Sequence, residues 1–316
     1  MEWTLKDSPV PPHAIPPMNA LYLYGCRQAS NPRMEWETDV DFAGIQELLA
    51  KHNARDGVAY LSAVHFLIRA VGVALKKHPE FNRRILRKKV YEYKNANVLL
   101  GMQHPVEKRA ELMLLKNVDK RSCEEIAGEI WQVYSSAIRG EFRYEADGRR
   151  MQRTPAFLHA PLVRFFLHAL NNWNLPATPY TERQRSSPVL VNYLSFPDAP
   201  PLNGYRASHL PADSYTLNVT LGAPQDRPAV NDRGEVVVKR LAHLFVQADH
   251  RLVDAIQLGM FVRTLRDLLQ NPSQLQEAAD ENPDEQAAVE PPSTPPVRHQ
   301  LNGHTSRINQ QPLQNK

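Results

Sequence analysis

Residues 247–255 read Gln-Ala-Asp-His-Arg-Leu-Val-Asp-Ala and connect two segments of different character. Before them, residues 236–247 are rich in β-branched side chains and predict a strand. After them, residues 251–269 place apolar side chains at helical spacing and predict an amphipathic helix. His250 ends the strand, and Asp254 follows four residues later. A strand-to-helix junction can hold a side chain in a fixed position, so this stretch is the first candidate for a functional site.

The two polar residues of the junction suit proton transfer. A histidine titrates near neutral pH, so His250 could remove a proton from a thiol or an alcohol. An aspartate at the start of a helix is favoured by the helix dipole, which suits Asp254. The spacing alone is a weak signal, because the chain has 12 histidines and some will precede an aspartate by chance. On spacing alone, a structural role is the more common one.

Outward from the junction, predicted helices and strands alternate. Apolar spacing predicts helices at 41–50, 61–77 and 155–171, and a capping box at 122–125 predicts the start of another. Runs at 189–194 and 215–221 predict strands. The chain has no Gly-rich phosphate loop, which argues against a nucleotide-binding sheet. The pattern predicts a mixed α/β domain.

Composition excludes several classes of protein. The 42% hydrophobic residues exclude global disorder, and two cysteines exclude a disulfide scaffold. The net charge of +4 is too small and too diffuse to indicate nucleic-acid binding. No apolar run is long enough to span a membrane, and no secretory signal is visible, so we expect a cytoplasmic protein.

Proline marks the ends of the chain, which has 26 prolines against 13 glycines. Residues 1–30 include a cluster of prolines and predict an extended N-terminal arm. Residues 275–316 are polar and Pro-rich, and predict a disordered tail. The catalytic-like domain is expected between them, at 31–274. Because the tail is acidic, that domain is more basic than the whole chain, which is compatible with a phosphate-bearing ligand.

Several stretches together resemble one family. Residues 249–255 resemble the Asp-His-Arg-x-x-Asp-Gly signature of the dihydrolipoyl acyltransferases, the core subunits of 2-oxo acid dehydrogenase complexes. They also resemble the His-x-x-x-Asp-Gly of chloramphenicol acetyltransferase. Further resemblance to the acyltransferases runs in order along the chain, at 37–41, 66–82, 119–126, 221–237 and 261–272. The resemblance therefore covers about residues 31–274.

The resemblance implies a fold and a mechanism. The implied fold is α/β in the α+β two-layer sense, a mixed sheet flanked by helices as in chloramphenicol acetyltransferase, assembled as a homotrimer. The implied substrate is coenzyme A or acyl-coenzyme A, with His250 at a subunit interface as general base on a thiol. Asp254 would pair with an arginine, for which Arg27 and Arg33 are the candidates. No metal is expected.

The sequence also departs from the family pattern. No lipoyl domain and no peripheral-subunit-binding domain precede the catalytic-like domain, so we expect no covalently bound lipoate and a possible separate carrier protein as partner. Asn192 stands where the family has the hydroxyl that stabilises the oxyanion. An amide can donate a hydrogen bond there, although a strand residue facing solvent is an equally good interpretation. Ala255 stands where the signature has glycine.

Three functions remain open from sequence. The first is a freestanding coenzyme A-dependent acyltransferase in which His250, Asp254 and Asn192 form the catalytic group. The second is a weakened or inactive scaffold or assembly protein that keeps the trimeric fold. The third is an acyltransferase that acts on an alcohol or an amine.

Overall fold

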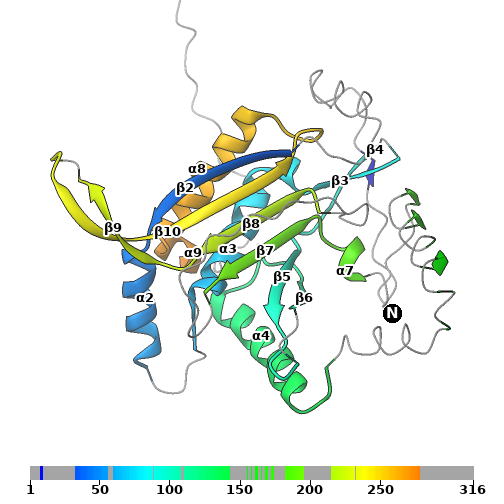
Figure 1. Ribbon diagram of the computed structural model, residues 1–316, viewed down its shortest axis with the longest axis horizontal. Coiled ribbons are helices and arrows are strands. Elements are labelled where there is room, and N and C mark those ends of the chain that lie inside the picture. Colours follow the sequence, from blue (N-terminus) through cyan, green and yellow to red (C-terminus); the bar gives the residue numbers. More distant parts are fainter. Residues whose placement is uncertain are drawn as a thin grey trace, which may run out of the picture. The chain divides into compact units, whose positions relative to one another are not determined.

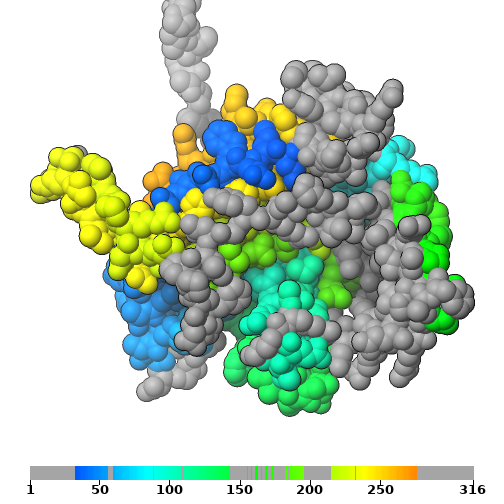
Figure 2. All heavy atoms as spheres, viewed as in Figure 1, coloured from blue at the N-terminus to red at the C-terminus, as the bar shows by residue number. Residues whose placement is uncertain are grey.

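Strand β10, Val236–Asp249, is the longest element of the sheet in the computed structural model of the chain (Figure 1). It pairs antiparallel with β2 (Arg33–Asp41) on one side and with β8 (Leu217–Gly222) on the other. Its first residues pair with β9 (Gln225–Val230), and this hairpin projects beyond the other strands (Figure 2). The structure describes residues 8–9, 33–55, 60–87, 89–107, 110–142, 182–195, 215–231 and 233–277, with isolated positions between 155 and 173.

The main sheet has the strand order β2-β10-β8-β7-β5-β6, with β9 attached to β10. Strand β7 (Val189–Leu194) runs parallel to both β8 and β5 (Val98–Gln103). Strand β6 (Ala110–Leu115) is antiparallel to β5. The predicted mixed sheet is therefore confirmed.

Helices pack against this sheet because alternate strand residues are apolar. Val191, Val219 and Val246 point to one face and are fully buried in the main core. The helices of that core are α2 (Ala43–Asn53), α3 (Ala63–Lys77), α4 (Cys123–Ile138) and α8 (Ala255–Gln270). Two shorter helices are α7 (Glu182–Arg185) and α9 (Ser273–Glu277), and η2 (Pro79–Phe81) is a single 3₁₀ turn. Among the described residues, no helix is long and apolar enough to cross a membrane.

The opposite face of the sheet is partly polar. Leu99, Leu114, Leu190 and Tyr215 form a small apolar cluster there. Beside it the strand residues become amides and hydroxyls that are still buried, namely Asn218, Thr220 and Gln247. A buried polar group without a hydrogen bond lowers the stability of the protein, so packing alone does not explain the polar residues of this face.

A second sheet holds a piece of the N-terminal arm. Strands β3 (Arg83–Leu86) and β4 (Lys89–Glu92) form a hairpin, and β1 (Ser8–Pro9) pairs with β4. The Thr216 hydroxyl donates to the Arg83 carbonyl at 2.5 Å, which ties this hairpin to the main sheet just before β8. Ser8 and Pro9 thus pair with a strand of their own chain.

The structure changes some predicted boundaries. The last long helix starts at Ala255 rather than 251, because Asp254 is its N-cap. Helix α9 extends past the predicted start of the tail at 275, because Leu275 is fully buried. The chain divides into compact units at 1–280 and 281–316, and every described residue belongs to the first. The predicted helix at 155–171 and the tail from 278 lie outside the described residues, apart from isolated positions of the former.

Arg69 is a buried charge that the apolar pattern of α3 did not predict. Its side chain is 0% exposed and donates to the carbonyls of Val118, at 3.1 Å, and Asp119. Its Nε also reaches the Leu275 carbonyl at 3.5 Å. Burial lowers the pKa of Arg69. One guanidinium therefore joins α3 to the turn before α4 and to the last helix.

The start of α3 depends on a neutral histidine. The backbone N–H of Ser62 donates to Nδ1 of His65 at 2.9 Å, so that nitrogen must be unprotonated. Burial lowers the pKa of His65 from 6.5 to about 4, although Glu124 opposes the shift. Because the unfolded chain binds a proton more readily at this site, it gains protons first as pH falls.

We predict that the free energy of unfolding decreases as pH falls from 6.5 towards 4, and that His65 accounts for part of this slope. Urea denaturation at several pH values measures it. The His65→Asn variant can still accept from the backbone but does not titrate, so its slope should be smaller. An unchanged slope in this variant would contradict the assignment, and the exposed Lys76→Ala serves as the control.

Candidate active site

The turn between β10 and α8 is held by its own side chains. Asp249 is 2% exposed and its carboxylate accepts from the Arg251 side chain, with Nη2 to Oδ2 at 2.5 Å and Nε to Oδ1 at 2.9 Å, and from the Arg251 backbone N–H at 3.0 Å. The Asp249 N–H donates to the Thr216 carbonyl at 2.9 Å, and its carbonyl accepts from Leu252 at 2.9 Å. The residue between this ion pair, His250, is thereby fixed in place.

His250 has a defined tautomer. Its Nδ1 lies 2.9 Å from the Val253 carbonyl oxygen. A carbonyl oxygen can only accept, so Nδ1 carries the proton and the neutral ring has its lone pair on Nε2. His250 is half-buried. These are the requirements of a general base that takes a proton on Nε2.

Asp254 is engaged in capping α8. Its Oδ1 accepts from the Gln257 N–H at 2.8 Å, and Gln257 Oε1 accepts from the Asp254 N–H at 2.9 Å. Ala255 is the first residue of the helix, a position that needs no glycine. The departure from the family signature at 255 therefore imposes no backbone strain.

Of the two arginines expected beside Asp254, the structure describes only Arg33, and its side chain binds other groups. Arg33 donates to Gln247 Oε1 at 2.7 Å and to the Tyr215 carbonyl at 3.3 Å. It stands opposite Asp249 in the register of β2 and β10. Arg27 lies outside the described residues. The pairing of Asp254 with an arginine stays a prediction.

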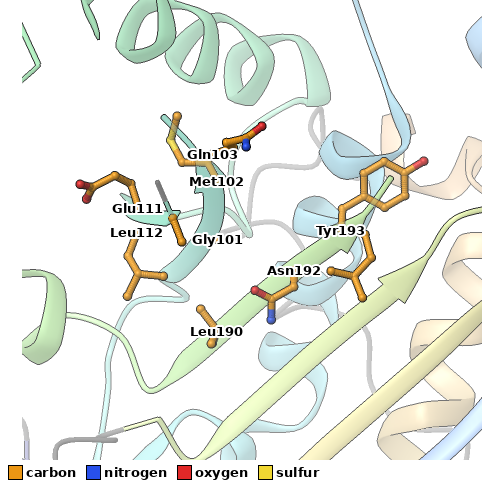
Figure 3. Close-up of a pocket in the computed structure, with 10 residues that line it drawn as sticks. Gly101, Met102, Gln103, Glu111, Leu112, Leu190, Asn192 and Tyr193 are labelled. Carbon is orange, nitrogen blue, oxygen red and sulfur yellow. The ribbon is translucent and has the colours of Figure 1, made fainter. Parts of the chain in front are cut away.

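Asn192 points into the partly polar face of the sheet. Its Nδ2 donates to Asn218 Oδ1 at 3.0 Å and weakly to Thr220 Oγ1 at 3.4 Å. Its Oδ1 lies over Gly101, where an added Cβ would stand only 2.5 Å away. Asn192 is half-buried rather than turned to solvent. Figure 3 shows Tyr193 directed away from it.

His250 and Asn192 lie at different ends of the sheet. The Asp249 N–H donates to the Thr216 carbonyl, and the Thr216 N–H donates to the Pro188 carbonyl, so these three residues lie side by side across the sheet. Asn192 instead pairs with Thr220, four residues further along β8. Four residues along the strands and two strand spacings separate Asp249 from Asn192, a distance of roughly 16 Å. In Figure 1 the end of β10 and the arrowhead of β7 point in opposite directions. One chain does not bring these two residues together.

A pocket of about 380 Å³ opens beside Asn192 (Figure 3). It lies over the ends of β5, β6 and β7, and its wall is largely aliphatic. The lining residues described by the structure are Gly101, Met102, Gln103, Ala110, Glu111, Leu112, Leu190, Asn192, Tyr193 and Leu194. A volume of this size is within the range of small-molecule sites.

Asn218 and Gly101 were missed by reasoning from sequence. Asn218 is 2% exposed, and its Nδ2 has no hydrogen-bond partner within the part of the chain that the structure describes. The signal was the alternation Leu217-Asn218-Val219-Thr220-Leu221, which places two polar residues on the face away from the main core. Gly101 carried no local signal, because its role comes from the strand beside it.

Cysteine and metal chemistry find no support in the described residues. Burial raises the pKa of Cys123 to about 12, so its thiol stays protonated and unreactive. No group of three or more potential metal ligands occurs among the residues that the structure describes.

Comparison with known proteins identifies the family. The family described as 2-oxoacid dehydrogenases acyltransferase (catalytic domain) matches residues 27–146 and 219–276, more than half of the chain. The chain belongs to this family. The predicted acyltransferase family and enzyme class are confirmed at this level, and the matched segments contain both His250 and Asp254. Asn192 falls between them.

One curated relative of this acyltransferase domain is the lipoamide acyltransferase component of the branched-chain alpha-keto acid dehydrogenase complex of Pseudomonas putida. It is 24% identical over 238 residues, which are 74% of this chain and 46% of the relative. The acyltransferase domain therefore spans about half of the length of that relative.

Two solved structures share the fold. The cubic core of the pyruvate dehydrogenase multienzyme complex has a TM-score of 0.56 and 14% identity, and the match covers 78% of this chain and 84% of that one. The same values hold for the dihydrolipoamide acetyltransferase of Azotobacter vinelandii, in a study of a serine, a histidine and an asparagine in its catalytic mechanism. At this identity the likeness concerns the fold.

We predict that Asp254→Ala lowers the free energy of unfolding by about 1 kcal/mol, because α8 loses its N-cap. The Asp254→Ser variant keeps a capping oxygen and should retain most of the stability. Chemical denaturation measures both.

The serine variant also tests the arginine pairing. If Asp254 acts through capping alone, Asp254→Ser retains acyl transfer close to the wild-type rate. A large loss of activity in a fully stable Asp254→Ser would show that the carboxylate charge is required.

Proposed function

We propose that this chain is a coenzyme A-dependent acyltransferase that moves an acyl group between a coenzyme A thioester and a thiol, with His250 as general base. The observation that carries the proposal is the hydrogen bond from His250 Nδ1 to the Val253 carbonyl, which leaves Nε2 as the proton acceptor. Membership of the acyltransferase family supports the reaction class. The preferred acceptor is a dihydrolipoyl group on a separate carrier protein.

The proposed reaction transfers one proton twice. Nε2 of His250 takes the proton of the acceptor thiol, and the thiolate attacks the carbonyl carbon of the thioester. The carbonyl electrons move to oxygen and form a tetrahedral oxyanion. When this intermediate collapses, the coenzyme A thiolate leaves and takes the proton from the imidazolium. The acceptor then holds the acyl group, and His250 is neutral again.

We place the complete site between two copies of the chain. The separation of roughly 16 Å within one chain prevents His250 and Asn192 from acting on the same carbonyl. A homotrimer, as the family resemblance implies, would bring His250 of one copy to Asn192 of the next.

The projecting hairpin supports association between copies. Val230 pairs with Val236 across β9 and β10, and Val238 shares their side of the ribbon. These valines are 68–75% exposed. An exposed apolar stripe on a projecting hairpin is suited to being covered by another chain.

Asn192 can stabilise the oxyanion only with its carboxamide turned over. As the side chain lies, Nδ2 donates towards β8 and Oδ1 is directed over Gly101. A half-turn would direct Nδ2 over Gly101. If the Asn218 carboxamide turned over as well, its Nδ2, which lacks a partner within the described residues, could donate to Asn192 Oδ1. Asn218 would thus determine which end of the Asn192 amide faces the substrate.

The amide as it lies also favours a second candidate function. With its donor engaged by β8, Asn192 would not stabilise an oxyanion, and the chain would act as an inactive scaffold that keeps the acyltransferase fold. The variants below separate the two.

Acyl transfer should depend on His250. The wild-type chain should release coenzyme A from an acyl-coenzyme A when dihydrolipoamide is added, and His250→Ala should lose most of this activity. Thiol release can be followed with a chromogenic disulfide after the acceptor has been separated. Equal release by both proteins excludes the proposed base.

Mixed oligomers test whether the site is shared. Each of His250→Ala and Asn192→Leu should be inactive alone, but co-expressed chains purified through two different tags should regain activity. Sites that join the intact His250 of one copy to the intact Asn192 of another form only in the mixture. If both residues acted within one chain, mixing would restore nothing. An active Asn192→Leu would remove Asn192 from the mechanism.

Acyl transfer should also depend on the ability of Asn218 to donate a hydrogen bond. An ionised aspartate only accepts, so Asn218→Asp should hold Asn192 Nδ2 in place and reduce kcat by about 10²–10³, with KM nearly unchanged. Thr220→Val is the matched control, because it removes only the weaker acceptor. Full activity in Asn218→Asp would contradict the turned-over amide.

A further inference from the structure

The pocket beside Asn192 lies where a substituent of the reacting carbonyl would extend. Asn192 lies on the pocket floor, with Leu190 and Leu194 on the same strand at either side. A carbonyl held at the Asn192 amide would direct one of its two substituents across β5 towards β6. The pocket lies in that direction (Figure 3).

Gly101 makes the carbonyl position accessible. A Cβ at this residue would approach Asn192 Oδ1 to 2.5 Å, so any side chain would displace the carboxamide. Gly101 has no positive φ, so its role is space rather than backbone freedom. The absence of a side chain on β5 therefore leaves room for both the Asn192 amide and a ligand atom.

The wall of the pocket is suited to an uncharged chain. Leu112, Leu190, Leu194 and Met102 give aliphatic contacts, and Ala110 at the start of β6 leaves the outer part open. A volume of about 380 Å³ corresponds to roughly a dozen water molecules, which is ample for a short aliphatic chain.

The charges at the wall disfavour an anionic ligand. Glu111 is the one ionised group among the lining residues that the structure describes, and it lies 3.4 Å from Arg183. The side chains of this pair are only 15% and 18% exposed, so the guanidinium is already committed to a carboxylate. A second carboxylate would lose its hydration and meet Glu111.

We propose that this pocket holds the acyl chain of the thioester, and that it selects an uncharged aliphatic chain of several carbons over one that ends in a carboxylate. The inference rests on the proposed function, because it places the reacting carbonyl at Asn192. It goes further by assigning the acyl class to residues of β5, β6 and β7.

The test compares acetyl-, hexanoyl- and succinyl-coenzyme A with dihydrolipoamide as acceptor. The wild-type kcat/KM should be at least tenfold higher for hexanoyl- than for acetyl-coenzyme A, and lowest for succinyl-coenzyme A. Ala110→Phe fills part of the pocket and should reduce the hexanoyl-to-acetyl ratio at least tenfold. Ala50→Phe, an equal change at an exposed position of α2, should leave the ratio unchanged.

A preference for succinyl-coenzyme A overturns the inference. It is also overturned if Ala110→Phe leaves the ratio unchanged, or if this variant raises KM for dihydrolipoamide instead, which would make the pocket an acceptor site.

A binding experiment separates failure of the pocket from failure of the reaction. Saturation-transfer NMR with hexanamide and succinamate as free probes needs no turnover, and each amide stands for the neutral thioester carbonyl. Hexanamide should bind the wild-type protein and Ala50→Phe but not Ala110→Phe, and succinamate, which ends in a carboxylate, should not bind. If no thioester is turned over but hexanamide binds in this pattern, the reaction is wrong and the aliphatic site stands. Turnover without hexanamide binding removes the pocket assignment alone.

Discussion

The backbone pairing of β10 between β2 and β8 is the constraint on which the site depends. This strand continues in register with β2 until Asp249, whose N–H donates to the carbonyl of Thr216, the residue before β8. His250 is the first residue released from the ladder. The Asp249–Arg251 pair and the Asp254 cap then turn the chain into α8 within a few residues. A fixed imidazole results from a strand end, an ion pair and a helix start in close succession.

One face of the main sheet is apolar, and the other carries buried polar side chains. Its apolar face packs against the helices, so the strands cannot shift without losing buried surface. That rigidity permits buried amides on the other face, where Asn192 and Asn218 meet at 3.0 Å. Within the part of the chain that the structure describes, Asn218 Nδ2 has no partner, which costs stability, and this arrangement persists because the strands that carry it are fixed by the opposite face.

Local sequence patterns predicted most of the helices and strands, whereas features that depend on contacts between distant segments were not predicted. The β-branched run at 236–247 and the capping box at Ser122 contain their own signals, and both elements formed as expected. The predicted start of the last long helix, at 251, was four residues early, because the buried Leu252 and Val253 continue the apolar pattern although the helix begins only after its cap at Asp254. His250 could be found because its motif is contiguous. The relation of Asn192 to Asn218 and Gly101 joins three strands, and no local pattern contains it. Arg69 was hidden for the same reason, since its partners lie at 118–119 and 275.

The pairing of β2 with β10 also determines when the chain can fold during its synthesis. Asp41 of β2 is matched with Leu241 of β10, so the edge strand β2 is synthesised about 200 residues before its partner. The carbonyl of Leu275 that Arg69 binds is made later still. Until then the nascent chain exposes an unpaired strand and a helix with an unsatisfied guanidinium, both features that favour aggregation and chaperone binding. The domain can close only after nearly all of its folded part has left the ribosome, so premature termination before β10 yields no partial enzyme.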